Sequence, residues 1–173
     1  MKVTLETDRL ILNPFEMSDA ISMYNNWASD SEVTKYVTWN THENVEVTKN
    51  ILNTWTLQYE KPERINFAIR LKETLELIGG IDVVGYIDGI PVIGYAIGRK
   101  FWNHGYMTEA CKKVLDFLFS LGYEKVRIDA LVENIASNKV IIKCGGEFVL
   151  TYKEYLKQKD KDVLINMYYI NKK

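Results

Sequence analysis

Apolar positions along the chain repeat with two different periods, and each period predicts a different kind of element. Where apolar and polar residues alternate we expect strands; Pro14 ends the first of them, and Asp88-Gly89 predicts a hairpin turn. In chain order these strands span 5–12, 65–71, 75–84, 90–98, 126–132, 147–156 and 163–170. Where apolar residues recur every three or four positions we expect helices. These span 18–30, 43–59, 108–121 and 134–143, with 33–39 as a loop or short turn.

Polar residues and glycines at the ends of these segments predict where the helices begin and stop. Ser18 and Thr41 are placed to cap the first two helices through their side-chain oxygens. Gly122 is placed as the C-terminal cap of the third helix, and Gly145-Gly146 ends the fourth.

The resulting order is β-α-α-β-β-β-α-β-α-β-β, which predicts an α/β protein. The middle strands form an antiparallel meander, and the helix 108–121 lies in one crossover connection between two parallel strands. At 173 residues the chain is expected to form a single domain, 1–173.

Composition and charge exclude several function classes. A formal net charge of −1 gives no electrostatic case for nucleic-acid binding. No secretory signal and no apolar run of membrane-spanning length is visible, so we expect a soluble cytoplasmic domain. Cys111 and Cys144 form no CxxC pair, and His42 and His104 stand alone. Neither a disulfide nor a metal site is therefore predicted.

The turn after the strand 90–98 is the first candidate site. It carries Trp102, Asn103, His104 and Gly105 and leads directly into the helix 108–121. Unpaired backbone N–H groups and the helix dipole favour an anion at such a place, so the turn is a candidate phosphate seat. Neither GxxxxGK[ST] nor GxGxxG is present, and Gly105 can equally serve only to tighten the turn.

The second candidate site follows the strand 126–132. Asn134, Ser137 and Asn138 lie in or before the first turn of the helix 134–143. Asn134 can cap this helix, and the same three polar side chains can hydrogen-bond an extended ligand that carries amides.

Three segments together resemble a known family. TDRLILNPFEMSDA, IGYAIGRKFWNHGYMTEA and VENIASNKVIIKCGGEF occur in the order and spacing of the GNAT N-acetyltransferases, RimJ/RimL-like branch. The resemblance spans nearly the whole chain. It implies the GNAT acyl-CoA N-acyltransferase fold, with a mixed, mostly antiparallel sheet of about six or seven strands. About four helices would flank that sheet, which would splay at its central parallel strands.

The resemblance implies acetyl-CoA as co-substrate and no metal. The backbone at Ile97–Arg99 would pair with the pantetheine arm, and Gly98 would leave room for it. The turn 102–107 matches the pyrophosphate loop: Gly105 agrees with the family pattern, Trp102 replaces the usual Gln or Arg, and Met107 replaces a small residue and narrows the seat. The implied cofactor-binding residues are Ile97, Gly98, Arg99, Asn103, His104, Gly105, Tyr106, Met107, Thr108, Asn134 and Asn138.

The resemblance also implies direct acetyl transfer through a ternary complex to a primary amine. The acceptor would be a protein N-terminal α-amine, a polyamine or a small-molecule amine; the alternative is a catalytically weak CoA-binding sensor module. A backbone N–H near Ile97 would stabilise the oxyanion. Ser137, or alternatively Tyr152, would protonate the leaving thiolate, and Asn134 would orient the thioester.

Two further roles stay open in the sequence. Asp82 and Glu109 are the candidates for the general base, although Glu109 also suits a helix N-terminus. Three aromatic residues, Tyr36, Trp39 and Trp55, wall the acceptor side or belong to the core. Because relatives commonly dimerise and the strand 163–170 is apolar enough to be paired or covered, a homodimer is favoured.

Overall fold

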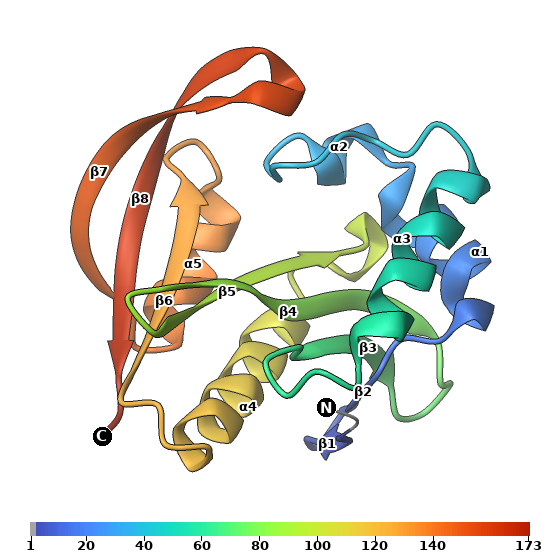
Figure 1. Cartoon of the computed structure of the whole chain (residues 1–173), viewed down its shortest axis with the longest axis horizontal. Helices are drawn as coiled ribbons and strands as arrows, with labels where there is room; N and C mark the ends of the chain where they lie inside the picture. Colours follow the sequence, from blue (N-terminus) through green and yellow to red (C-terminus); the bar gives the residue numbers. More distant parts are fainter. Residues whose placement is uncertain (1–2) are drawn as a thin grey trace.

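The computed structural model describes residues 3–173, and its eight strands form one sheet in the order β1-β2-β3-β4-β5-β6-β8-β7 (Figure 1). The strands are β1 (Leu5–Glu6), β2 (Leu10–Asn13), β3 (Asn66–Leu71), β4 (Leu77–Ile87), β5 (Ile90–Ile97), β6 (Lys125–Leu131), β7 (Glu147–Leu156) and β8 (Lys161–Asn171). Neighbouring strands run antiparallel except β5 and β6, which are parallel. The predicted mixed, mostly antiparallel fold with one parallel crossover is therefore confirmed, with eight strands in the described residues.

The helices cover both faces of this sheet. They are α1 (Ala20–Met23), α2 (Ser31–Thr34), α3 (Val45–Gln58), α4 (Tyr106–Ser120) and α5 (Ile135–Lys143), with short helical turns η1 (Met17–Asp19), η2 (Tyr24–Ala28), η3 (Arg99–Phe101) and η4 (Lys157–Lys159). One buried cluster joins the sheet to α4 and α5, and a second joins it to α1, η2 and α3. The long β7–β8 hairpin arches over the sheet towards α2 (Figure 1).

The N-terminal strand prediction, 5–12, is wrong in one respect, because the chain turns back on itself within it. Thr7 causes the turn: its hydroxyl accepts the N–H of Leu10 at 2.9 Å, and its own N–H reaches the Leu10 carbonyl at 3.0 Å. The two halves pair as β1 and β2 instead of forming one strand.

Both predicted N-caps are also wrong. The first helical segment begins two residues earlier, with Glu16 as its N-cap; Asp19 accepts the N–H of Glu16, and Ser18 lies inside the segment. Asn44 caps α3 through its side-chain oxygen, which accepts from Glu46 and Val47. Thr41 bonds the Thr34 hydroxyl instead. Asn44 lies directly before α3, so its side chain reaches the first-turn N–H groups that Thr41, three residues earlier, does not cap.

The homodimer was predicted from the strand 163–170, but that strand does not lie at the edge of the sheet. β8 lies between β6 and β7, so the strand at this edge is β7. The homodimer stays a prediction, and β7 is the strand whose edge a second copy would meet.

Candidate functional site

The parallel pair β5–β6 opens into a wedge. The two strands pair only at Val92 with Arg127 and at Ile93 with Ile128, and beyond these positions they separate. The N–H of Gly98 donates to Ile78 of β4 at 2.9 Å. Because backbone groups alternate sides along a strand, the N–H of Ile97 points the other way, into the wedge. The predicted splay and its inward-facing donor are thus present.

The turn that follows β5 is fixed to the strand end. The indole N–H of Trp102 donates to the Ile97 carbonyl at 2.9 Å, so this side chain ties the loop to the wedge. Gly98 packs closely against η2. A Cβ there would lie 2.6 Å from the Asn26 carbonyl oxygen, so this packing by itself requires glycine, and the room for a pantetheine arm stays a prediction.

Helix α4 begins without a side-chain cap. Its N-cap Gly105 has φ 79°, a left-handed conformation, and offers no side-chain acceptor to the first turn. In contrast, α3 and α5 are capped by Asn44 and Asn134. The first-turn N–H groups of α4 and the positive end of its dipole are therefore left for an anion.

Arg9 and aromatic rings hold this uncapped helix start in place. The Arg9 guanidinium lies 4.6 Å from the centre of the Tyr106 ring and donates to the His104 carbonyl at 3.0 Å. The His104 ring stacks on Tyr106 with centroids 5.5 Å apart. Met107 does not narrow the seat as predicted, because its side chain is buried in the α4 core cluster.

Glu109 faces β1 and β2. It accepts hydrogen bonds from Thr7 and from the backbone and side chain of Arg9, with which it forms an ion pair at 2.6 Å. Burial raises the pKa of Glu109, but these hydrogen bonds outweigh burial and leave it below its ordinary value. The contacts give Glu109 a structural role at the helix start, and its catalytic role stays a prediction.

The start of α5 brings Asn134 and Ser137 to the wedge. Asn134 caps the helix by accepting the N–H of Ser137 at 3.1 Å, and both residues line a cavity there. Asn138 is committed elsewhere. Its amide group donates to the carbonyls of Leu131 and Asn134, and its oxygen accepts from Asn166 and Tyr168. These bonds use the full hydrogen-bonding capacity of the Asn138 side chain. The contact with CoA that the resemblance implies for Asn138 stays a prediction.

A hydroxyl pair that the sequence did not reveal joins β5 to α5. The Tyr95 hydroxyl lies 2.9 Å from Ser137 Oγ and 3.4 Å from the Ser137 carbonyl oxygen. Burial raises the pKa of Tyr95, so the phenol keeps its proton. Tyr95 therefore fixes the side chain that was predicted to donate a proton. The two residues are 42 positions apart, and no spacing rule connects them.

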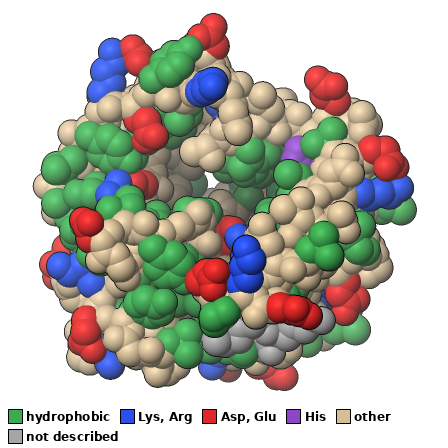
Figure 2. All heavy atoms as spheres, in the orientation of Figure 1, with side chains coloured by type: hydrophobic (Ala, Val, Ile, Leu, Met, Phe, Trp, Pro, Cys, Tyr) green, Lys and Arg blue, Asp and Glu red, His purple; other side chains and the backbone are tan. Residues whose placement is uncertain are grey.

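The cavity passes through the sheet at the wedge. Its volume is about 450 Å³, and its lining comes from both buried clusters, including Trp27 on the α1–α3 side and Ile128 on the α4 side. Figure 2 shows its opening as a hollow in the middle of this face. Four residues with predicted chemical roles line it: Asp82, Asn134, Ser137 and Tyr152.

Asp82 has the electrostatics of a base. Burial raises its pKa to about 6, although Arg64 at 3.7 Å and the Asn66 amide at 3.5 Å both favour the carboxylate. The Asn66 amide is itself oriented, since its oxygen accepts the Tyr59 hydroxyl at 3.2 Å. A carboxylate with a raised pKa accepts a proton more readily than an ordinary one.

Tyr152, the alternative proton donor, also lines the cavity. Its hydroxyl donates to Asp129 at 2.9 Å and accepts from Arg127 at 3.2 Å. Burial and the Asp129 carboxylate raise the pKa of Tyr152. The Tyr152 proton is thus hydrogen-bonded to Asp129. Ser137 is therefore the better candidate of the two proton donors.

Among residues 3–173, no group of three or more His, Cys, Asp or Glu is placed to hold a metal ion. The same residues contain no helix long and apolar enough to cross a membrane. Neither Cys111 nor Cys144 lines the cavity.

Comparisons with known proteins agree with this geometry. The acetyltransferase (GNAT) domain family matches residues 9–147. The uncharacterized N-acetyltransferase YoaA of Bacillus subtilis (strain 168) is 30% identical over 171 residues, covering 97% of this chain and 96% of YoaA. A GNAT-family acetyltransferase from Bacillus anthracis has a TM-score of 0.85 at 24% identity, with 98% of both chains covered. RimL, the ribosomal L7/L12 α-N-protein acetyltransferase solved with coenzyme A, has a TM-score of 0.83 at 18% identity, again with 98% of both covered.

Proposed function

The chain belongs to the GNAT acetyltransferase family, and from that membership we propose that it transfers an acetyl group directly from acetyl-CoA to a primary amine. The acceptor is a protein N-terminal α-amine, a polyamine or a small-molecule amine, bound together with acetyl-CoA in a ternary complex. The observation that carries the proposal is the β5–β6 wedge, which opens onto one cavity lined by Asp82, Asn134 and Ser137.

The cofactor seat is built from backbone. The extended edge at Tyr95–Ile97 is free of β6 and suits the amides of a pantetheine arm. The uncapped start of α4 suits the pyrophosphate, and Arg9 holds its loop in place. Acetyl-CoA supplies the activated thioester. The residues present therefore fit it, and no metal is needed.

The protein's own groups handle charge and protons. Asp82, directly or through water, takes the proton that the acceptor ammonium must lose before its nitrogen can attack. The Ile97 N–H stabilises the oxygen that becomes negative as the carbon–nitrogen bond forms. When the carbon–sulfur bond breaks, Ser137 donates a proton to the departing thiolate and regains one, directly or through water, from the nitrogen, which loses its second proton as it becomes an amide. The Asn134 side chain, at the cavity, orients the thioester.

Thermal unfolding with acetyl-CoA, CoA and NADH tests cofactor binding. At a hundred times its dissociation constant, acetyl-CoA adds about 2.7 kcal/mol of stability and raises Tm by about 5 to 10 °C. We expect this rise with both CoA species and none with NADH. Release of CoA thiol in the presence of an amine then tests the transfer.

A pair of glycine variants locates the phosphate seat. Gly105→Glu puts a carboxylate at the start of α4, and Gly122→Glu introduces the same strain after its end, since both glycines have positive φ. Both variants should lose similar stability without ligand, but only Gly105→Glu should lose the acetyl-CoA shift. An unchanged shift in Gly105→Glu would place the pyrophosphate elsewhere.

A further inference from the structure

The acceptor side of the cavity has aromatic walls. Phe15 and Trp55 pack with ring centroids 5.2 Å apart, and Trp39 lies 5.3 Å from the His42 ring. All four line the cavity. Large apolar surfaces of this kind bind an apolar body, because each buried square ångström of such surface contributes about 25 cal/mol.

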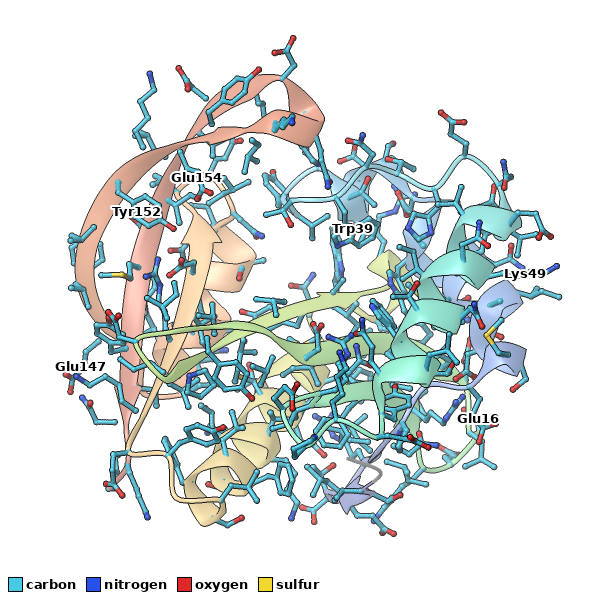
Figure 3. All side chains as sticks on the ribbon, viewed as in Figure 1. Glu16, Trp39, Lys49, Glu147, Tyr152 and Glu154 are labelled. Carbon is cyan, nitrogen blue, oxygen red and sulfur yellow. The ribbon has the colours of Figure 1, made fainter. Side chains whose placement is uncertain are left out.

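The opposite wall comes from the β7–β8 hairpin. Tyr152, Glu154 and Leu156 alternate along β7, so all three project to the same side of the strand, and all three line the cavity. Figure 3 shows Trp39 across the opening from Tyr152 and Glu154. The exposed Glu154 carboxylate thus lies at the mouth, opposite an aromatic ring.

The hairpin also meets α2 above the cavity. The Lys159 ammonium donates to the Thr34 carbonyl, and Tyr36 packs against the buried cluster that contains Leu131 and Leu156. These contacts close the cleft into a channel whose mouth is visible in Figure 2.

The charged residues of the lining all have one sign. They are Asp82, Asp129 and Glu154, and no lysine or arginine in the described chain lines the cavity. Arg127 neutralises Asp129 through three hydrogen bonds, and Arg64 lies 3.7 Å from Asp82. Glu154 makes no ion pair with any residue of 3–173. An ammonium therefore finds a partner in this channel, while a carboxylate finds none.

We infer that the acceptor is a primary amine carried by an aromatic or large apolar group, with no carboxylate on the amine-bearing carbon. A free arylalkylamine has this chemistry. So does a peptide N-terminus whose first residue has a large apolar side chain, because the carboxyl group of that residue is part of a neutral peptide bond. Free amino acids bring an unpaired carboxylate, and polyamines have no aromatic or large apolar group to pack against the aromatic walls. This inference rests on the proposed function, since it names the substrate class of the same site.

A matched series of amines tests the inference. The probes are 2-phenylethylamine, phenylalaninamide, phenylalanine, glycinamide, spermidine and the tripeptide Phe-Gly-Gly. Turnover is measured as the release of CoA thiol. Binding of each amine to the enzyme–CoA complex is measured by calorimetry. We expect 2-phenylethylamine and phenylalaninamide to exceed phenylalanine by about 100-fold or more in kcat/KM, because the unpaired carboxylate is rejected. Glycinamide and spermidine should also be weaker.

Each outcome bears on the inference. Phe-Gly-Gly as the best probe identifies a chain terminus, and 2-phenylethylamine as the best identifies a small amine; both support the shared chemistry. Phenylalanine equal to its amide, or spermidine or glycinamide as the best probe, would overturn it. If calorimetry gives the expected order but no CoA is released with any amine, the inference stands and the proposed transfer fails. If CoA is released in a different order, the transfer stands and the inference fails.

Two variants assign the selectivity to residues. Glu154→Gln should raise KM for phenylalaninamide about tenfold by removing a charged partner of the ammonium, with acetyl-CoA affinity unchanged. Glu147→Gln is the control, because Glu147 is an exposed acid on the same strand, away from the opening (Figure 3). Trp39→Ala should reduce the ratio of kcat/KM for phenylalaninamide to kcat/KM for glycinamide. General destabilisation of the protein does not change this ratio. An unchanged ratio in Trp39→Ala and an unchanged KM in Glu154→Gln would contradict the assignment.

Discussion

Replacing Tyr95 with phenylalanine removes one hydroxyl from the pair at the wedge and leaves the ring in place. The lost bond to Ser137 Oγ is 2.9 Å long and joins two neutral groups, so its net contribution to stability is about 1 kcal/mol. If Ser137 protonates the departing thiolate, a Ser137 side chain that is free to rotate should lose a similar amount of transition-state stabilisation. A loss of about 1 kcal/mol lowers kcat about fivefold.

The assay separates positioning from packing. CoA-thiol release gives kcat and KM, and calorimetry gives the dissociation constant of acetyl-CoA, which should not change. Ser137→Ala removes the donor itself and should lower kcat by about 100-fold or more. Tyr168→Phe is the control, since it also removes a buried hydroxyl hydrogen bond, to Asn138 at 2.7 Å, without touching Ser137. It should lose stability but retain kcat.

The double variant Tyr95→Phe/Ser137→Ala decides the matter. Because Tyr95 is proposed to act only through Ser137, the double variant should be no slower than Ser137→Ala. If the two losses multiply instead, Tyr95 acts independently and the reasoning is refuted. A large loss in Tyr152→Phe together with a small one in Ser137→Ala would move the proton donor to Tyr152.

Two carboxylates give predictions that depend on pH. Since the pKa of Asp82 is raised to about 6, kcat/KM should rise with pH through that value, and Asp82→Asn should abolish the rise; an unchanged profile would exclude Asp82 as the base. The folded state also favours protonated Asp82, so the wild type should lose stability relative to Asp82→Asn as pH increases from 3.8 to about 6 in urea unfolding. The pKa of Glu109 is shifted in the opposite direction, so its effect on stability has the opposite pH dependence. Because its folded pKa is lowered, Glu109→Gln should cost about 1 kcal/mol at pH 7, and this difference should disappear as pH falls below 4.5. If Glu109→Gln instead lowers kcat at full stability, the catalytic role predicted for it is supported.

The sequence was most informative where local chemistry determines structure. The strand–turn–helix segment through Gly105, the Asp88-Gly89 hairpin and the helix ending near Gly122 all follow from short-range rules, and the structure has them. Asn134 capping α5 is another such case. Family resemblance then placed these elements around a common ligand.

The remaining features depend on contacts between distant segments. No periodicity shows that Tyr95 meets Ser137, or that Lys159 reaches Thr34 across 125 positions. Met107 illustrates the same limit, because the family pattern compares residue sizes but not the direction in which a side chain points. Gly98 is predicted to make room for a ligand, and the structure adds a neighbour that by itself requires glycine, the carbonyl of Asn26, which is remote in sequence.

The early separation of β5 from β6 has a consequence for hydrogen exchange. Past Ile93, β5 is bonded to β4 on one side only, so the amides of Tyr95 and Ile97 have no strand partner. In the free protein these two amides should exchange with solvent deuterium far faster than that of Ala96, which faces β4. A bound pantetheine arm would protect the two together, making them reporters of cofactor occupancy even in variants that transfer nothing.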